Sequence, residues 1–357
     1  LPPGADGALS KDAFGARILP AIDAFKADLV IISAGFGPHR RDPLGGLELD
    51  EQDFAYATDA LMEVIYPRHK PGFCVFWMNE PDTSSHKFGV LGSETEAAMR
   101  MADDNFGRLL AWWQAGNGPE NIVVMSDHGQ ITGHAQLETL DIIPAEFGRA
   151  SIGSFSGIYL DDASDARKAD VVDWLVRQDF CGLVFASDGE GNAIPGALPW
   201  SAVRNDHPRG ADIGFTLRAT NSSDEYGPDV DGCIFAAWIT PGGGMHGGLN
   251  RGELSTVLAA RGPAYREHFA SDVPCWLPDI IPTILTTMGL PTEGSEGRPL
   301  VEALVGDDPR FGMVPPVDTR TLSAGLHGHE QYLRQWVVDG RTIVDCGWTA
   351  GRGAWGR

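Results

Sequence analysis

Acidic and imidazole side chains follow three apolar segments of this sequence, each inside a loop of small residues. The residues are Asp82 and His86 in FWMNEPDTSSH, Asp127 and His128 in VVMSDHGQ, and His246 in TPGGGMHGG. Carboxylate oxygens and imidazole nitrogens together are ligands that Zn²⁺ and neighbouring divalent metals take in proteins. Two Asp–His pairs and one further histidine therefore predict a site for two metal ions. In two-metal hydrolases, the two ions contact the oxygen atom that attacks the substrate and the oxygen atom that leaves it.

Each of these patterns also has an ordinary structural explanation. Asp82 is placed to cap a following helix, His86 to lie on a helix surface, and a histidine among glycines is common in plain loops. The three patterns occur in order, each after a predicted strand, and this joint occurrence favours the metal site. Asp206–His207 forms another pair, but no apolar strand leads into it, so we interpret it as a structural loop.

Strands and helices must alternate to bring these side chains together. Apolar runs predict strands at Asp28–Gly35, Gly72–Met78 and Asn121–Ser126. Helical spacing predicts helices at Phe14–Phe25, Asp50–Val64 and Thr95–Trp113. One face of the second helix carries Phe54, Ala57, Leu61 and Val64. This alternation predicts an α/β fold with a mostly parallel, doubly wound sheet flanked by helices, in which ligands bind beyond the carboxyl ends of the strands.

The second half of the chain has a different texture. Residues 151–232 contain short strands, glycines and acidic turns, which predict a small irregular α+β subregion. Ile234–Ile239 predicts another strand, and Val273–Leu290 predicts a helix with a proline near its start. Near the end, Asp339–Gly340 between two apolar runs predicts a β-hairpin.

Composition limits the class of protein. The 357 residues are 43% hydrophobic and 21% charged, as in soluble globular proteins. The net charge of −22 opposes binding to nucleic acid polymers and to anionic membranes. The five cysteines are widely spaced, which predicts free, buried thiols. No apolar run is long enough to span a membrane and no signal peptide is visible, so we expect a cytoplasmic location, with an N-terminus that is incomplete at Leu1.

Four longer runs carry a family resemblance: EPDTSSHKFG, VVMSDHG, MHGGLNRGELSTVLAARGPAYRE and DVPCWLPDIIPTILTTMGLPTEGSEGRPL. Together they resemble the type I phosphodiesterase / nucleotide pyrophosphatase branch of the alkaline phosphatase superfamily, over about residues 65–357. The resemblance implies a hydrolase that acts on a small phosphate ester and uses two zinc ions. By that resemblance, one zinc ion is held by Asp82, His86 and His246. The other zinc ion is held by Asp127 and His128.

The resemblance also implies two functional residues upstream of Asp82. One is an aspartate at a strand end, as a third protein ligand of the second zinc ion, and the other is a threonine or serine nucleophile. The serine and threonine residues upstream of Asp82 are Ser10, Ser33 and Thr58. Ser10 precedes any predicted strand, Ser33 lies within a predicted strand, and Thr58 lies within a predicted helix. We therefore expect one complete zinc site, no nucleophile, and weak or absent activity in this chain.

The front of the chain, residues 1–64, resembles the C-terminal part of a histone deacetylase / acetylpolyamine amidohydrolase domain. The resemblance lies in DLVIISAGFGPHRRDPLGGLELDEQDF, where Asp42 matches a zinc ligand of that family. The other ligands of that family are missing, and one carboxylate cannot form a three-ligand catalytic site. Two arrangements stay open for it. In one, its strand at Asp28–Gly35, the helix at Asp50–Val64 and the strand at Gly72–Met78 form a βαβ unit that fills part of the sheet edge. In the other, which we favour, the fragment is loosely attached.

The predicted domains are a deacetylase-like fragment at 1–64, a phosphodiesterase core at 65–307 that lacks its first strand and contains the irregular subregion, and a tail at 308–357. The join near Glu63–Pro67 is compatible with a gene fusion, a frameshift or an assembly artefact. Two further functions stay open on this evidence. One is a zinc-dependent deacetylase, and the other is a non-catalytic protein that binds metal or phosphate.

Overall fold

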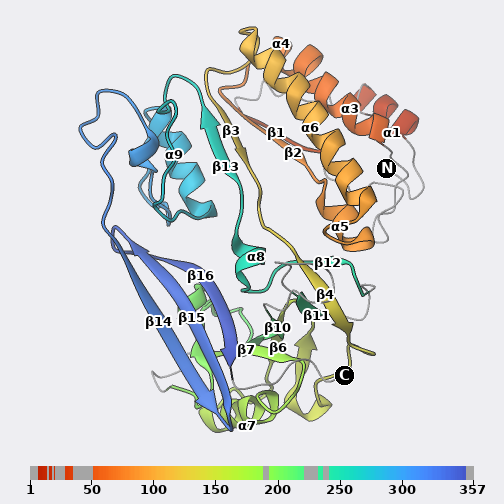
Figure 1. Cartoon of the computed structure of the whole chain (residues 1–357), viewed down its shortest axis with the longest axis vertical. Helices are drawn as coiled ribbons and strands as arrows, with labels where there is room; N and C mark the ends of the chain where they lie inside the picture. Colours follow the sequence, from red (N-terminus) through yellow and green to blue (C-terminus); the bar gives the residue numbers. More distant parts are fainter. Residues whose placement is uncertain are drawn as a thin grey trace. The chain divides into compact units, whose positions relative to one another are not determined.

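The computed structural model describes residues 7–13, 16–17, 20, 29–34, 51–187, 193–220, 232–235 and 241–350 (Figure 1). The chain forms two compact units, Leu1–Glu120 and Asn121–Arg357. Among the described residues, no helix is both long enough and apolar enough to cross a membrane. Most of the predicted helix at Phe14–Phe25, the loop that carries Asp42 and residues 236–240 lie outside the described residues.

A parallel strand pair is the centre of the first unit. Strand β1 (Leu29–Ala34) pairs with β2 (Phe73–Met78), in a register that runs from Leu29 opposite Phe73 to Ala34 opposite Met78. Both strands were predicted to within one residue at each end. Parallel neighbours need a crossover connection, and the chain between them is helical from residue 51 to 69. Helix α1 (Gly7–Ala13) precedes the pair.

The crossover helix contains a π-helical turn. Helix α3 (Glu51–Asp59) continues into the π-helix η2 (Ala60–Ile65) and then into α4 (Tyr66–His69). Its buried residues are Thr58, Ala60, Leu61 and Ile65. The predicted apolar face ended at Val64, which is only partly buried. A π-turn inserts one extra residue into a helix, so the buried face moves on by one position, to Ile65.

The predicted join between two partial domains, Glu63–Pro67, lies inside this continuous helical segment. Pro67 lies in the first turn of α4, directly after the π-helical turn. Farther along the unit, α5 spans Asp82–Phe88 and α6 spans Ser93–Gln114. An ion pair joins Arg108 of α6 to Asp59 of α3. Figure 1 shows α3, α4 and α6 packed beside the β1–β2 pair.

Truncating Leu61 tests whether the crossover helix is integral to this unit. Leu61 is 5% exposed, so we expect Leu61→Ala to destabilise the unit by about 2–5 kcal/mol. Hydrogen exchange of the amides of residues 51–78 measures the effect. Leu91→Ala is the matched control, because Leu91 is 73% exposed and its truncation is expected to change stability by less than about 0.5 kcal/mol. Equal exchange in the two variants would instead support a loosely attached front fragment.

The second unit begins with the strand that precedes Asp127. Strand β3 (Ile122–Met125), predicted at Asn121–Ser126, pairs antiparallel with β13 (Leu258–Arg261). A four-stranded sheet follows in the order β10–β11–β4–β12. Its strands are β10 (Ala219–Thr220), β11 (Gly232–Phe235), β4 (Ile131–Gln136) and β12 (Gly244–Met245). This sheet therefore ends on the short strand that leads directly into His246.

The region predicted to be irregular contains a regular sheet and a large apolar core. The sheet has the order β5–β6–β9–β7–β8. Its strands are β5 (Arg149–Ser151), β6 (Phe155–Tyr159), β9 (Ile213–Leu217), β7 (Cys181–Ala186) and β8 (Leu198–Pro199). Helix α7 (Asp165–Leu175), which was not predicted, contributes Val171, Val172 and Leu175 to the core. Short 3₁₀ turns lie at η3 (Ala145–Phe147) and η4 (Trp200–Val203).

A three-stranded antiparallel sheet forms the C-terminal part of the described chain. Its strands are β14 (Val317–Leu326), β15 (His329–Val338) and β16 (Arg341–Ala350), side by side in Figure 1. The predicted turn at Asp339–Gly340 is confirmed. Both of its residues have positive φ, 48° and 75°, as the two-residue turn favoured in hairpins requires. His327–Gly328, with φ of 53° and 79°, makes the same turn between β14 and β15.

Two buried glutamines join this C-terminal sheet to the five-stranded sheet and to the turns beside it. Gln331 accepts a hydrogen bond from the backbone N–H of Val184 at 2.7 Å and donates one to the carbonyl of Gly196 at 2.6 Å. Gln335 donates to the carbonyl of Ala202 at 2.6 Å. Both side chains are fully buried, so these bonds satisfy polar groups that would otherwise be costly to bury.

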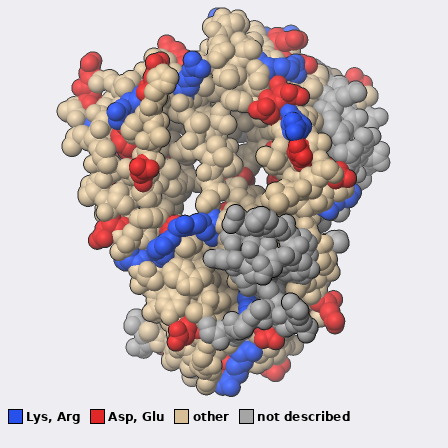
Figure 2. Space-filling model, in the orientation of Figure 1, with Lys and Arg blue, Asp and Glu red and all other residues tan. Residues whose placement is uncertain are grey.

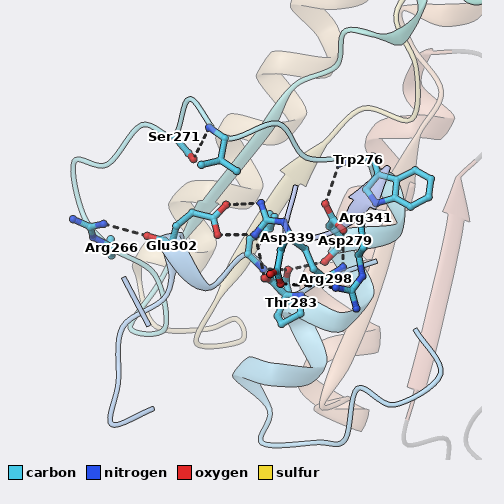
Figure 3. Close-up of polar contacts among 12 residues, drawn as sticks. Arg266, Ser271, Trp276, Asp279, Thr283, Arg298, Glu302, Asp339 and Arg341 are labelled. Atoms are coloured by element: carbon cyan, nitrogen blue, oxygen red, sulfur yellow. Dashed lines mark hydrogen bonds and ion pairs between the residues drawn. The ribbon is translucent and has the colours of Figure 1, made fainter. Parts of the chain in front are cut away.

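A buried polar network fixes the segment around helix α9 (Ile280–Thr287; Figure 3). Arg298 donates to both carboxylate oxygens of Glu302, at 2.7 and 2.8 Å, and both side chains are almost fully buried. Asp279 accepts from the backbone N–H of Arg298 at 2.7 Å and from that of Trp276 at 3.2 Å. Burial raises the pKa of Asp279 above its ordinary value, although these bonds oppose the rise.

The helix predicted at Val273–Leu290 is shorter than expected. The 3₁₀ turn η5 (Leu277–Asp279) leads into α9 (Ile280–Thr287), and η6 (Val301–Ala303) follows. Pro282 lies in the first turn of α9, where a missing N–H costs little. In the last turn of α9, the hydroxyls of Thr286 and Thr287 donate to the backbone carbonyls of Pro282 and Ile284, and such bonds compete with a continued helix.

The predicted α/β class is confirmed, and the described sheets are mixed. The parallel pairs are β1–β2, β4–β11 and β7–β8, and the other described pairs are antiparallel. Four cysteine side chains are described and all are free thiols, but only Cys181 is fully buried. Acidic and basic side chains are interspersed on the face shown in Figure 2.

Candidate metal centre

The first half of the candidate centre lies at the start of helix α5, directly after β2. Glu80, two residues before Asp82, is buried, and its carboxylate accepts hydrogen bonds from the backbone N–H of Ser84 at 3.1 Å and from the hydroxyl of Ser84 at 3.0 Å. Glu80 therefore supplies an acceptor for the first turn of the helix. Asp82 is the first residue of α5 rather than its cap.

Asp82 and His86 lie one helical turn apart on the same face of α5. Asp82 Oδ1 and His86 Nε2 are 3.4 Å apart, and the two side chains are 34% and 30% exposed. One tetrahedral zinc ion with ligand distances of about 2.0–2.2 Å can contact two atoms at this separation. The donor atoms and their spacing therefore fit a metal ion that is reached from solvent.

The second half begins in the loop after β3. His128 donates its backbone N–H to Asp127 Oδ1 at 3.1 Å, and its Nε2 lies 3.5 Å from Asp127 Oδ2. His128 Nδ1 lies 3.1 Å from the carbonyl oxygen of Gly129. The tautomer protonated at Nδ1 uses this carbonyl as its acceptor and leaves Nε2 free to bind a metal, as is usual for histidine ligands.

His246 follows strand β12 and lies against His128. The two imidazole rings are stacked, with centroids 3.5 Å apart and planes at 10°. Gly247 has a φ of 96°, a conformation that favours glycine, and it turns the chain sharply after His246. Within the second unit, the fold thus brings together Asp127, His128 and His246. In the first unit it brings together Asp82 and His86. The grouping of His246 with the latter pair stays a prediction.

Two buried acids near the candidate ligands were not predicted from the sequence. Glu80 lies beside Asp82, and Glu253 lies in helix α8 (Arg251–Leu254), which follows the loop of His246. The signal for Glu253 was present, because Asn250 and Glu253 have the spacing of a capping box and form one. The signal for Glu80 was weaker, since an acid before a proline is common in loops.

The remaining candidates have structural positions. His207 lies in an exposed loop, and its Nδ1 accepts the backbone N–H of Arg209 at 3.1 Å. Thr58, one of the upstream hydroxyl residues, is 1% exposed inside α3. Ser33 lies within β1, as expected, and Ser10 lies in α1, a helix that was not predicted and that precedes β1. None of these three residues lies in a loop that follows a strand, where the family resemblance places the nucleophile.

A comparison with known families identifies the class of protein. A model of the type I phosphodiesterase / nucleotide pyrophosphatase family matches residues 22–213, which include the first Asp–His pair and the second. The chain belongs to the type I phosphodiesterase / nucleotide pyrophosphatase family. The match begins within the front segment, upstream of residue 65, where the sequence placed the start of the core.

A solved structure supports the fold. Murine ectonucleotide pyrophosphatase / phosphodiesterase 5 (ENPP5, NPP5) is similar to this chain with a TM-score of 0.55 and 15% sequence identity. The similarity covers 78% of this chain and 72% of that chain. The α/β architecture is therefore shared with an ectonucleotide pyrophosphatase / phosphodiesterase.

Curated relatives match shorter parts. The uncharacterized protein slr0245 of Synechocystis is 38% identical over 68 residues, 19% of this chain and 22% of that protein. A venom phosphodiesterase of Macrovipera lebetinus is 33% identical over 78 residues, 21% of this chain and 9% of that protein. Type-2 histone deacetylase 2 of Dictyostelium discoideum is 38% identical over 50 residues, 14% of this chain and 3% of that protein. Both resemblances are confirmed, and the chain spans no more than 22% of the length of these relatives.

Proposed function

We propose that this chain is a metal-dependent hydrolase of small phosphate esters, of the phosphodiesterase / nucleotide pyrophosphatase type. The observation that carries the proposal is the pair of Asp–His sites. Asp82 and His86 place ligand atoms 3.4 Å apart, and Asp127 and His128 place theirs 3.5 Å apart. Membership of the family supports the same class of reaction.

Zinc is the proposed cofactor, with two ions implied by the family resemblance. Asp82, His86 and His246 would hold one ion, and Asp127 and His128 would hold the other. A bound zinc ion supplies positive charge that stabilises the phosphoryl oxygens of the transition state. The protein's part is to orient the ligands: Gly129 fixes the ring of His128, and the glycine-rich loop positions His246 against it.

A nucleotide or another small phosphate ester is the proposed substrate. Murine ENPP5 has been solved as an inactive threonine-to-alanine variant in complex with AMP, which supports this substrate class for a chain of the same fold. The net charge of −22 opposes the approach of long polyanions such as nucleic acids. A small ester carries less charge, and bound cations can reverse the local field.

We further propose that the 357-residue chain is a weak catalyst. The family resemblance places an aspartate ligand and a threonine or serine nucleophile upstream of Asp82. The hydroxyl residues found there are Ser10, Ser33 and Thr58, none of which follows a strand end. Without a hydroxyl held beside the phosphorus atom, the reaction loses the rate that positioning supplies.

A kinetic experiment separates this proposal from its alternatives. With bis(p-nitrophenyl) phosphate, we expect weak turnover that a chelator abolishes, and no covalent phospho-enzyme after a phosphate-labelled substrate is added. The Asp127→Ala variant should lose the remaining turnover, whereas Asp206→Ala, in the exposed Asp–His loop, should keep it. Zinc binding with no turnover would support a non-catalytic protein. Release of acetate from an acetyl-lysine peptide would instead support the deacetylase.

A further inference from the structure

Glu253 is a buried carboxylate close to His246 that the proposed function does not use. It is 4% exposed and lies in the first turn of α8. Its Oε1 accepts the backbone N–H of Gly248 at 2.9 Å, and its Oε2 accepts that of Asn250 at 3.1 Å. A buried carboxylate needs such partners, because a buried charge without hydrogen bonds is strongly unfavourable. The glycine-rich loop after His246 is therefore tied to one side chain.

Glycine is needed where this loop meets the carboxylate. A Cβ atom at Gly248 would lie 2.5 Å from Glu253 Oε2, far inside van der Waals contact. The preceding residue, Gly247, has the positive φ of 96° that reverses the chain after His246. The two glycines thus allow the loop to come close to the Glu253 carboxylate, and the hydrogen bond from Gly248 holds the backbone two residues from His246.

The backbone of Glu253 holds the other ligand loop. Its carbonyl oxygen accepts the N–H of Gly129, the residue after His128, at 2.8 Å. A Cβ atom at Gly129 would lie 2.2 Å from the carbonyl oxygen of Gly252, so this loop packs directly on the segment that contains α8. Ser126 adds two bonds with Val257, at 3.0 and 3.1 Å.

We propose that Glu253 is a positioning residue that sets His246 against His128. Its side chain holds the loop of His246, and its main chain holds the loop of His128, so one residue connects the two. Their imidazole rings, 3.5 Å apart, are the result of that connection. In this role Glu253 acts through His246. The effect of Glu253 on zinc affinity rests on the proposed function, whereas its effect on the stacking of His246 on His128 does not.

The test compares Glu253→Gln with a buried glutamate elsewhere in the unit. Glutamine keeps the size of the side chain but replaces one acceptor oxygen by an NH₂ group, which faces an N–H donor. In the metal-free protein, we expect the ring resonances of His246 in the NMR spectrum to lose the ring-current shift that stacking on His128 causes. Glu302→Gln is the matched control, because Glu302 is 2% exposed but bonds Arg298. It should lower the melting temperature and leave the His246 resonances unchanged.

Zinc affinity provides a second measurement. Loss of an outer partner of a metal ligand typically weakens binding about 10–100-fold, and we expect this for Glu253→Gln. Because Glu253 acts through His246, the Glu253→Gln/His246→Ala double variant should bind zinc no more weakly than His246→Ala alone. An additive loss, or unshifted His246 resonances in Glu253→Gln, would overturn the proposal.

A second variant covers the case in which Glu253→Gln does not fold. Gly248→Ala keeps the charge of Glu253 but pushes its flexible carboxylate away from the loop, so the same His246 resonances should move. Unchanged resonances in folded Gly248→Ala would count against the positioning role. If the wild-type chain binds no zinc, the proposed function fails, and the metal-free NMR comparison still decides the role of Glu253.

Discussion

Alanine in place of His246 is expected to remove the tightly bound zinc ion from this protein. The proposed site has three protein ligands, Asp82, His86 and His246, and zinc sites need at least that number to bind tightly. Loss of a ligand should weaken binding by more than the roughly 100-fold that loss of an outer partner can cause. Metal analysis of dialysed protein and competition with a chromogenic chelator measure the change.

The same measurements give the stoichiometry. We expect about one tight zinc ion per wild-type chain, because the second site has only Asp127 and His128 as protein ligands. His207→Ala is the control, since His207 belongs to an Asp–His pair in an exposed loop. An equally tight pair of ions in the wild type, or equal losses in His246→Ala and His207→Ala, would contradict the assignment.

Restoring a nucleophile should produce the largest gain in activity. The change is to replace the front of the chain by a family-type segment, in which a strand ends in aspartate and a threonine follows. We expect turnover of an aryl phosphodiester to rise by about three orders of magnitude or more, because the hydroxyl is then held beside the phosphorus atom. Steady-state kinetics and detection of a labelled phospho-enzyme measure the gain.

Two variants of the restored protein complete the test. The same segment with alanine in place of its threonine should show the weak turnover of the original chain and no phospho-enzyme. Asp127→Ala in the restored protein should abolish turnover. Full-speed turnover by the original 357-residue chain would show that it already contains a nucleophile.

Much of the fold follows from local sequence patterns. Strands β1 and β2 are short apolar runs with turn residues around them, and Asp339–Gly340 has the turn chemistry of a tight hairpin. The Asp–His pairs were predicted for the same reason, since each directly follows a strand. These features depend on residues that are close together in the sequence, so they can be predicted from it.

Other features depend on burial, which a sequence displays less clearly. Helix α7 was missed because one position of its buried face is Lys168, 4% exposed, which interrupts the apolar stripe. The buried face around Leu61 was misplaced by one residue because nothing in the sequence announces the π-turn. Glu80 and Glu253 resemble solvent-exposed acids until the fold shows the N–H groups that surround them.

The two glutamines of β15 form hydrogen bonds with main-chain atoms, which every amino acid supplies. Gln331 and Gln335 bond the backbone of Val184, Gly196 and Ala202, so the attachment does not depend on the identity of side chains in the partner segments. Substitutions in the loops between those segments leave the attachment chemically intact. A lineage can therefore alter these connecting loops while the C-terminal sheet keeps its anchorage.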